Sequence, residues 1–143
     1  MILLDAYALV ALLRGEAAGD EVEKLVCTRD CAATLVNVSE CVDVSCRVYG
    51  RAFEDVREVF GRLAVSELLL VVAPNEETAF RAGDLRQTHY AKRTCEISLA
   101  DCYLIAGAGT DDEIATADPA VAAVARAEGI AIVPLPDSSG RRP

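Results

Sequence analysis

Two kinds of hydrophobic pattern alternate along this chain of 143 residues. Short, mostly apolar segments predict strands at Ile2–Leu4, Ala33–Val36, Leu68–Ala73, Glu113–Thr116 and Ile130–Val133. Longer segments with apolar residues every three or four positions predict helices at Tyr7–Leu13, Glu16–Cys27, a segment ending near Tyr49, Ala52–Val65, Asn75 to about Lys92, Ser98–Ala108 and Pro119–Glu128. Apolar strands separated by helices indicate an α/β fold, in which helices cover both faces of a parallel sheet.

The domain organisation follows from the same pattern, because no internal repeat and no linker interrupts it. A chain of this length is most simply one domain and buries enough surface to be stable without disulfide bonds. The last segment, PDSSGRRP, continues neither pattern. We therefore expect a single domain over residues 1–136 and a loose tail over residues 137–143.

The composition argues against two classes of function, nonspecific nucleic-acid binding and zinc binding. The net charge of −9 and the absence of Trp argue against nonspecific nucleic-acid binding through basic and aromatic side chains. Contact with nucleic acid would therefore need a mediator such as bound metal ions, whereas a basic protein partner would match the acidic surface directly. Six cysteines without a C-x-x-C pair, and a single histidine, favour reduced and mostly buried thiols over a zinc site.

The start of the chain predicts where the protein resides. Asp5 interrupts the first apolar segment too early for a signal peptide, and no apolar run is long enough to span a membrane. We therefore expect a cytoplasmic protein with no membrane partner.

Four acidic residues stand where predicted helices begin: Asp5, Glu40, Asp101 and Asp118. Each has an ordinary explanation as a helix cap, worth about 1 kcal/mol. In an open parallel sheet, however, ligands bind outside the carboxyl ends of the strands. Short connections would aim these side chains at that crevice.

Taken together, the four acids raise an energetic question. Two carboxylates about 4 Å apart repel by roughly 4 kcal/mol at an effective dielectric constant near 20. Four converging carboxylates therefore need protons or a cation to relieve the repulsion. Hard divalent cations prefer oxygen ligands, and such a site lowers the pKa of bound water and neutralises charge on a phosphodiester.

Four segments carry a family resemblance: MILLDAYALVALLRGE, TLVNVSECVDVSCR, SLADCYLIAGA and IATADPAVAAVA. In order and spacing they resemble the signature segments of PIN-domain ribonucleases, in particular the VapC-type toxins of toxin–antitoxin pairs. The resemblance implies a PIN-like, flavodoxin-like fold. It also implies that Asp5, Glu40, Asp101 and Asp118 hold one or two Mg²⁺ or Mn²⁺ ions, which activate water to cleave RNA.

The resemblance extends to supporting residues and partners. Thr116 corresponds to a polar residue in the strand before the last acid, and Asn37 to a polar residue near the site. The family generally forms homodimers and is silenced by a cognate VapB-type antitoxin, which we expect on the helices around Cys41–Val65. Tyr7 departs from the family pattern of a small residue, and it forms either a wall of the RNA cleft or part of the core.

Contact with RNA also needs basic side chains that donate hydrogen bonds to phosphate groups. The candidates are basic side chains at the end of the first helix and shortly before the SLAD segment: Arg14, Arg86, His89 and Arg93. They would form a basic rim that positions phosphate groups. The alternative is a solvated helix face.

Other functions remain open at this point. A receiver-like domain would need an aspartate at the end of a central strand, but LLLVVAPN offers Pro74 and Asn75. A nucleotide-binding domain would need a glycine-rich phosphate loop, which the sequence lacks. The acids could instead be caps in a binding-only domain. A PIN nuclease of RNA maturation or decay, working without an antitoxin, is the nearest alternative.

Overall fold

The computed structural model describes residues 1–15 and 17–143, without the side chain of Ala17. Along the chain the elements are β1 (Ile2–Leu4), α1 (Ala6–Arg14), α2 (Ala17–Thr28), β2 (Cys31–Thr34), α3 (Leu35–Asp43), the π-helical turn η1 (Val44–Val48), α4 (Phe53–Val65), β3 (Leu70–Val72), α5 (Glu76–His89), α6 (Leu99–Gly107), β4 (Glu113–Thr116), α7 (Pro119–Ala127) and β5 (Ala131–Pro134). The predicted helix Glu16–Cys27 corresponds to α2, and its first residue lies outside the described residues.

The five strands form one parallel sheet in the order β3-β2-β1-β4-β5. In the centre of the sheet, Ile2 of β1 is paired with Cys31 of β2 on one side and Glu113 of β4 on the other. Chain order therefore reverses at β1, and the crevice at its carboxyl end is the position where ligands bind in open sheets of this kind. The predicted α/β class is confirmed.

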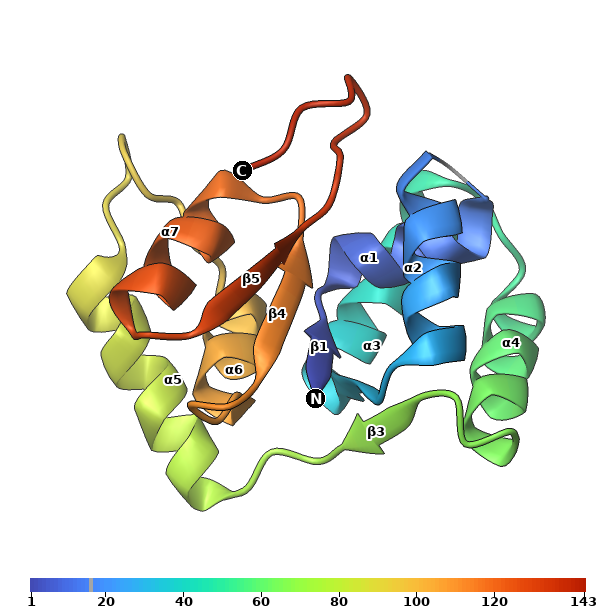
Figure 1. Ribbon diagram of the computed structural model, residues 1–143, viewed down its shortest axis with the longest axis horizontal. Helices are drawn as coiled ribbons and strands as arrows, with labels where there is room; N and C mark the ends of the chain where they lie inside the picture. The colour runs from blue at the N-terminus through green and yellow to red at the C-terminus, as the bar shows by residue number, and fades with distance from the viewer. Residues whose placement is uncertain (16) are drawn as a thin grey trace.

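Helices cover the sheet on both sides, with α1 to α4 on one face and α5 to α7 on the other (Figure 1). The central strand β1 contributes side chains to the hydrophobic cores on both faces of the sheet, because successive side chains of a strand point to opposite faces. Ile2 and Leu4 enter the core under α1, α2 and α3, whereas Leu3 enters the core under α5, α6 and α7. Both faces are therefore buried at the centre of the sheet.

The second strand lies two residues earlier than predicted, at Cys31–Thr34 instead of Ala33–Val36. Leu35 and Val36 form the first turn of α3. The reason is a helix cap, since the Thr34 side chain accepts a hydrogen bond from the backbone N–H of Asn37 at 3.1 Å. The apolar run continues through the strand end, so hydrophobicity alone cannot locate this boundary.

The third strand, Leu70–Val72, is shorter than the predicted Leu68–Ala73 and lies at the edge of the sheet. It is not buried on both faces, because Leu70 is 55 % exposed and Val72 is also exposed. An edge strand needs only one neighbour, so the continuous apolar run misled the prediction of a fully covered strand.

The carboxyl-terminal residues 137–143, expected to be loose, make several contacts. Asp137 accepts hydrogen bonds from the backbone N–H groups of Ser139 and Arg141. Arg142 forms an ion pair with Glu21 of α2 at 2.6 Å. In Figure 1 this segment arches over the end of the sheet and returns to the start of α7. The division into a domain and a separate tail stays a prediction.

Candidate metal centre

Asp5 lies where β1 ends, beside the central strand β4. Its backbone N–H donates to the carbonyl oxygen of Ala115 at 3.3 Å, and its carboxylate accepts a hydrogen bond from the backbone N–H of Ala8 at 2.6 Å. Asp5 is thus the N-cap of α1, as one interpretation of the sequence proposed. Its carboxylate is also buried, with the residue only 3 % exposed. A surface cap needs no such burial.

Thr116 links Asp5 to Asp118 through a single hydroxyl group. The Thr116 hydroxyl accepts a hydrogen bond from the backbone N–H of Asp118 at 2.9 Å and hydrogen-bonds the carboxylate of Asp5. Asp118 in turn caps α7, since its carboxylate accepts from the backbone N–H of Ala120 at 2.6 Å. Unlike Asp5, Asp118 is exposed. Thr116 therefore contacts both Asp5 at the end of β1 and Asp118 after β4, and it fixes their relative positions.

Asp101 is held by a reciprocal cap at the start of α6. Its carboxylate accepts from the backbone N–H of Ser98 at 2.9 Å, and the Ser98 hydroxyl accepts from the backbone N–H of Asp101 at 3.1 Å. This is the capping box that the sequence SLAD predicts. One carboxylate oxygen, Oδ2, is used in the box, so the other remains available to a ligand.

Glu40 is different, because it caps no helix. It lies within α3, one helical turn beyond Asn37, and its Oε2 atom is buried without a hydrogen-bond partner in the described structure. The Nδ2 atom of Asn37 is also buried and unpartnered there, while its Oδ1 atom accepts a hydrogen bond from the Thr34 hydroxyl. Buried polar atoms of this kind normally have a partner.

Electrostatic coupling connects the four acids. Burial raises the pKa of Asp5 to about 7, the Thr116 hydroxyl and the Ala8 N–H oppose this, and the charges of Asp101 and Asp118 raise it further. Burial also raises the pKa of Glu40, with the charge of Asp101 adding to the shift. The charge of Asp101 thus acts on both Asp5 and the half-buried Glu40, and the charge of Asp118 acts on Asp5.

This donor set is the kind that a hard divalent cation prefers, because it consists of carboxylate oxygens with buried unpartnered polar atoms beside them. No three His, Cys, Asp or Glu side chains in the described part of the chain stand close enough to hold one ion between them. Mg²⁺ typically keeps several waters and binds one or two carboxylates directly. The residues therefore fit an ion that is bound partly through water.

Three of the four basic residues expected to form a rim contact a nearby aromatic or acidic side chain. The Arg14 guanidinium lies over the ring of Tyr49, 3.6 Å from its centroid, and Arg86 lies over Tyr90 at 4.9 Å. The Nε2 atom of His89 lies within hydrogen-bond distance of a Glu128 carboxylate oxygen, at 2.9 Å. Arg93 is exposed in the connection before α6. The RNA-binding role of all four basic residues stays a prediction.

Two residues near the acids were missed in the sequence. Thr34 fixes Asn37, and its signal was the N-cap pattern Thr-Leu-Val-Asn just before Glu40. Tyr49 lines a small cavity together with Tyr7 and Glu40, but no local pattern pointed to it. Tyr7 itself is half-buried and packs against the first core, and its hydroxyl donates to the carbonyl oxygen of Pro136 at 2.9 Å.

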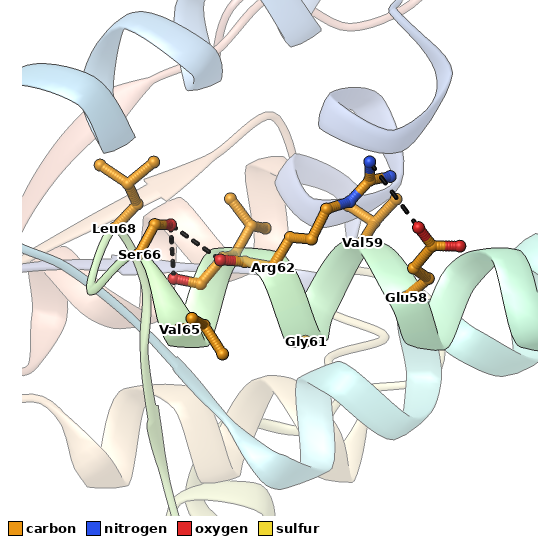
Figure 2. A pocket seen from close by; sticks show the side chains of 8 residues that line it. Glu58, Val59, Gly61, Arg62, Val65, Ser66 and Leu68 are labelled. Atoms are coloured by element: carbon orange, nitrogen blue, oxygen red, sulfur yellow. Dashed lines mark hydrogen bonds and ion pairs between the residues drawn. The ribbon is translucent and has the colours of Figure 1, made fainter.

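A separate groove of about 790 Å³ follows helix α4, away from the four acids. Figure 2 shows Val59, Val65 and Leu68 along it, with the Glu58–Arg62 ion pair at one end and Ser66 at the other. No helix in the described part of the chain has the length and hydrophobicity needed to cross a membrane.

The fold is similar to that of several solved structures. One is described as the crystal structure of FitAcB from Neisseria gonorrhoeae, with TM-score 0.63, 21 % identity and coverage of 92 % of this chain and 96 % of that chain. Another is a toxin–antitoxin complex from Klebsiella pneumoniae, with TM-score 0.60, 21 % identity and coverage of 86 % and 91 %. A third is FitAB bound to an IR36 DNA fragment, with TM-score 0.62, 19 % identity and coverage of 93 % and 94 %. At these identities the likeness concerns the fold.

Sequence comparison assigns the family. No curated protein matches the chain. The model of the PIN domain, however, matches residues 2–127, which include all four acids. The chain therefore belongs to the PIN-domain family.

Proposed function

We propose that this protein is a metal-dependent endoribonuclease toxin that a cognate VapB-type antitoxin holds inactive. PIN domains are generally metal-dependent nucleases, which supports hydrolysis of phosphodiesters. One observation carries the proposal: the buried Asp5 and the half-buried Glu40, whose Oε2 atom is buried without a described partner, both have raised pKa values, and the charge of Asp101 acts on both. Repulsion between neighbouring carboxylates lowers the stability of the fold, and a bound cation would offset this cost.

Each residue of the site has a role in this proposal. Asp5, Glu40, Asp101 and Asp118 hold the cation, and Mg²⁺ or Mn²⁺ would lower the pKa of bound water and neutralise charge on the phosphodiester. Thr116 orients the Asp5 carboxylate through its hydroxyl.

Two further groups support the four acids. Asn37 lies one turn before Glu40, and its unpartnered amide group can donate to an oxygen in the site. The basic side chains Arg14, Arg86, His89 and Arg93 would contact RNA phosphates outside the metal centre.

The test compares the native chain with Asp101→Asn on a total RNA pool containing Mg²⁺, Mn²⁺ or EDTA. The native chain should cleave the pool at discrete positions, and EDTA should abolish this cleavage. We expect Asp101→Asn to lower the rate by at least about 100-fold, because one of the charges that hold the cation is lost. Mapping the cut positions would identify the RNA class.

A matched control separates the metal role of Asp101 from its role in the capping box. Ser98→Ala removes the other half of the box but keeps the carboxylate. It should cost about 1 kcal/mol of stability and leave cleavage near the native rate at low temperature. Equal losses of activity in Ser98→Ala and Asp101→Asn would mean that Asp101 is only a helix cap. Cleavage that persists in EDTA would reject the metal centre.

The antitoxin is the proposed partner because the similar solved structures include a toxin–antitoxin complex. The groove along α4 is the surface we assign to it, within and just beyond the region Cys41–Val65 expected from the family resemblance. Val59, Val65 and Leu68 offer an apolar seat for an amphipathic helix. We further propose that the toxin forms a homodimer, as its family resemblance implies.

A further inference from the structure

A second, smaller cavity is lined by Glu40, one of the four acids. Its volume is about 220 Å³, which is below the range of about 300–1,000 Å³ typical of small-molecule sites. The residues that line it come from α1 and from the continuous helix formed by α3 and η1: Ala6, Tyr7, Val10, Glu40, Val44 and Tyr49. Because Glu40 belongs to both the cavity and the acid cluster, the two sites are contiguous.

Both aromatic walls of this cavity are held in place by other parts of the molecule. The Tyr7 hydroxyl donates to the carbonyl oxygen of Pro136, which follows the last strand. The Arg14 guanidinium lies over the ring of Tyr49, and Tyr49 itself closes the π-helical turn η1. A π-helical turn redirects the residues after it and is frequent at functional sites. The rings therefore form fixed flat walls.

The chemistry of the cavity selects a flat and uncharged occupant. Its walls are aliphatic or aromatic, and among its described lining residues Glu40 alone carries a charge. The described lining residues offer no positive charge to a phosphate group, so the cavity does not suit the backbone of a nucleic acid. Aromatic side chains bind unpaired bases by stacking, independently of sequence because every base has a π-face.

We propose that this cavity accepts one unpaired base of the RNA, from a nucleotide next to the phosphodiester that is cleaved. This inference rests on the proposed nuclease function and adds a base-binding subsite to it. Tyr7 and Tyr49 are its walls, and Glu40 separates the base from the metal centre. Such a subsite recognises single-stranded RNA, since a paired base cannot enter it.

The experiment uses single-stranded RNA hexamers with 2-aminopurine at one position and random bases at the other five. The protein has no Trp, so the fluorescence of this base can be followed without interference. Asp101→Asn provides the background, in the presence of Mg²⁺, so that the RNA is not consumed during the measurement. In this background we expect binding to quench the fluorescence by stacking.

Adding Tyr49→Ala should weaken binding about 5- to 100-fold and remove the quenching, the range that loss of one base–aromatic stack covers. Tyr49→Phe should behave as the parent because it keeps the ring. The control is Phe80→Ala, which removes an aromatic side chain that is 76 % exposed on α5, on the other face of the sheet. It should leave both binding and quenching unchanged.

Other results would overturn the inference. They are an absence of quenching in the parent, no effect of Tyr49→Ala, or equal effects of Tyr49→Ala and Phe80→Ala. An effect of Tyr49→Ala on antitoxin binding alone would assign the cavity to the protein partner instead. If the native chain cleaves RNA but Tyr49→Ala does not change the fluorescence quenching, only the base subsite is rejected. If quenching depends on Tyr49 but the native chain cleaves no RNA, only the nuclease function is rejected.

Discussion

At the scale of single residues, three of the four acids cap helices and Glu40 does not. Asp5 caps α1 through the N–H of Ala8, and Asp118 caps α7 through the N–H of Ala120. A cap is satisfied by one carboxylate oxygen, and it needs no burial. Glu40 caps nothing and has a buried oxygen without a described partner. The capping interpretation is therefore correct for three acids and incomplete for the group.

Burial of Asp5 predicts a pH dependence of stability. The folded-state pKa is about 7 against an ordinary value of 3.8, so the native state holds a proton between these values and carries a buried anion above them. The free energy of unfolding should therefore fall as the pH rises from about 4 through 7, by an amount on the order of 4 kcal/mol. Asp5→Asn should remove this loss, because the amide stays neutral and still caps the helix.

The measurement is urea unfolding of the native chain and Asp5→Asn at pH 5 and pH 8 in EDTA. The gain in stability from Asp5→Asn should be larger at pH 8. Asp55→Asn, which removes an exposed charge from α4, controls for the net charge of −9 and should show no such trend. Adding Mg²⁺ should shrink the gain, because a bound cation stabilises the native chain. A gain of equal size at both pH values would contradict the buried anion.

At the scale of elements, the approach of α1 and α2 depends on one glycine. A Cβ atom on Gly19 would lie 2.5 Å from the carbonyl oxygen of Ala11 in α1. This contact involves backbone, so no side-chain rotation can relieve it. Since Asp5 is the N-cap of α1, the packing of the helix pair also fixes the helix next to this acid.

Two helix glycines allow a matched comparison. Gly19→Ala should cost about 1–3 kcal/mol, because the two helices must move apart. Gly61→Ala, in the exposed interior of α4 with open space around its Cβ position, should instead gain up to about 1 kcal/mol through helix propensity. Chemical denaturation of both variants measures these changes. Destabilisation by Gly61→Ala, or none by Gly19→Ala, would contradict the packing described for α1 and α2.

At the scale of the whole molecule, the proposed activities lie on different surfaces. The proposed metal centre lies at the carboxyl ends of the strands, whereas the groove that we propose for the antitoxin follows α4. Val65 on this groove is 87 % exposed, which is a large apolar exposure for an unpartnered surface. A partner on α4 can therefore be lost without loss of the nuclease.

Val65→Asp should weaken binding of the antitoxin by at least about ten-fold, since a charge would be buried in an apolar contact. RNA cleavage in the absence of the antitoxin should be unchanged. The probe is the cognate antitoxin proposed above, and its binding is measured by calorimetry. Phe80→Asp, on the opposite face, is the control and should bind normally. Equal binding by the Val65→Asp variant would place the antitoxin elsewhere.

The sequence by itself determined the alternation of strands and helices, the parallel sheet, and the three acids that cap helices, Asp5, Asp101 and Asp118. These features follow from local rules: hydrophobic period, capping residues, and the fact that parallel strands end at the same side of a sheet. Even the capping box of Ser98 and Asp101 could be predicted from four consecutive residues.

Only the tertiary structure decided which of these residues are buried and which meet. In the structure the second strand ends at Thr34, and the third strand is exposed at the edge of the sheet. Tyr7, Tyr49 and Glu40 line one cavity. Burial and proximity arise from contacts between residues far apart in the chain, which no local pattern contains. The raised pKa of Asp5 is such a property, because it depends on burial and on the distant charges of Asp101 and Asp118.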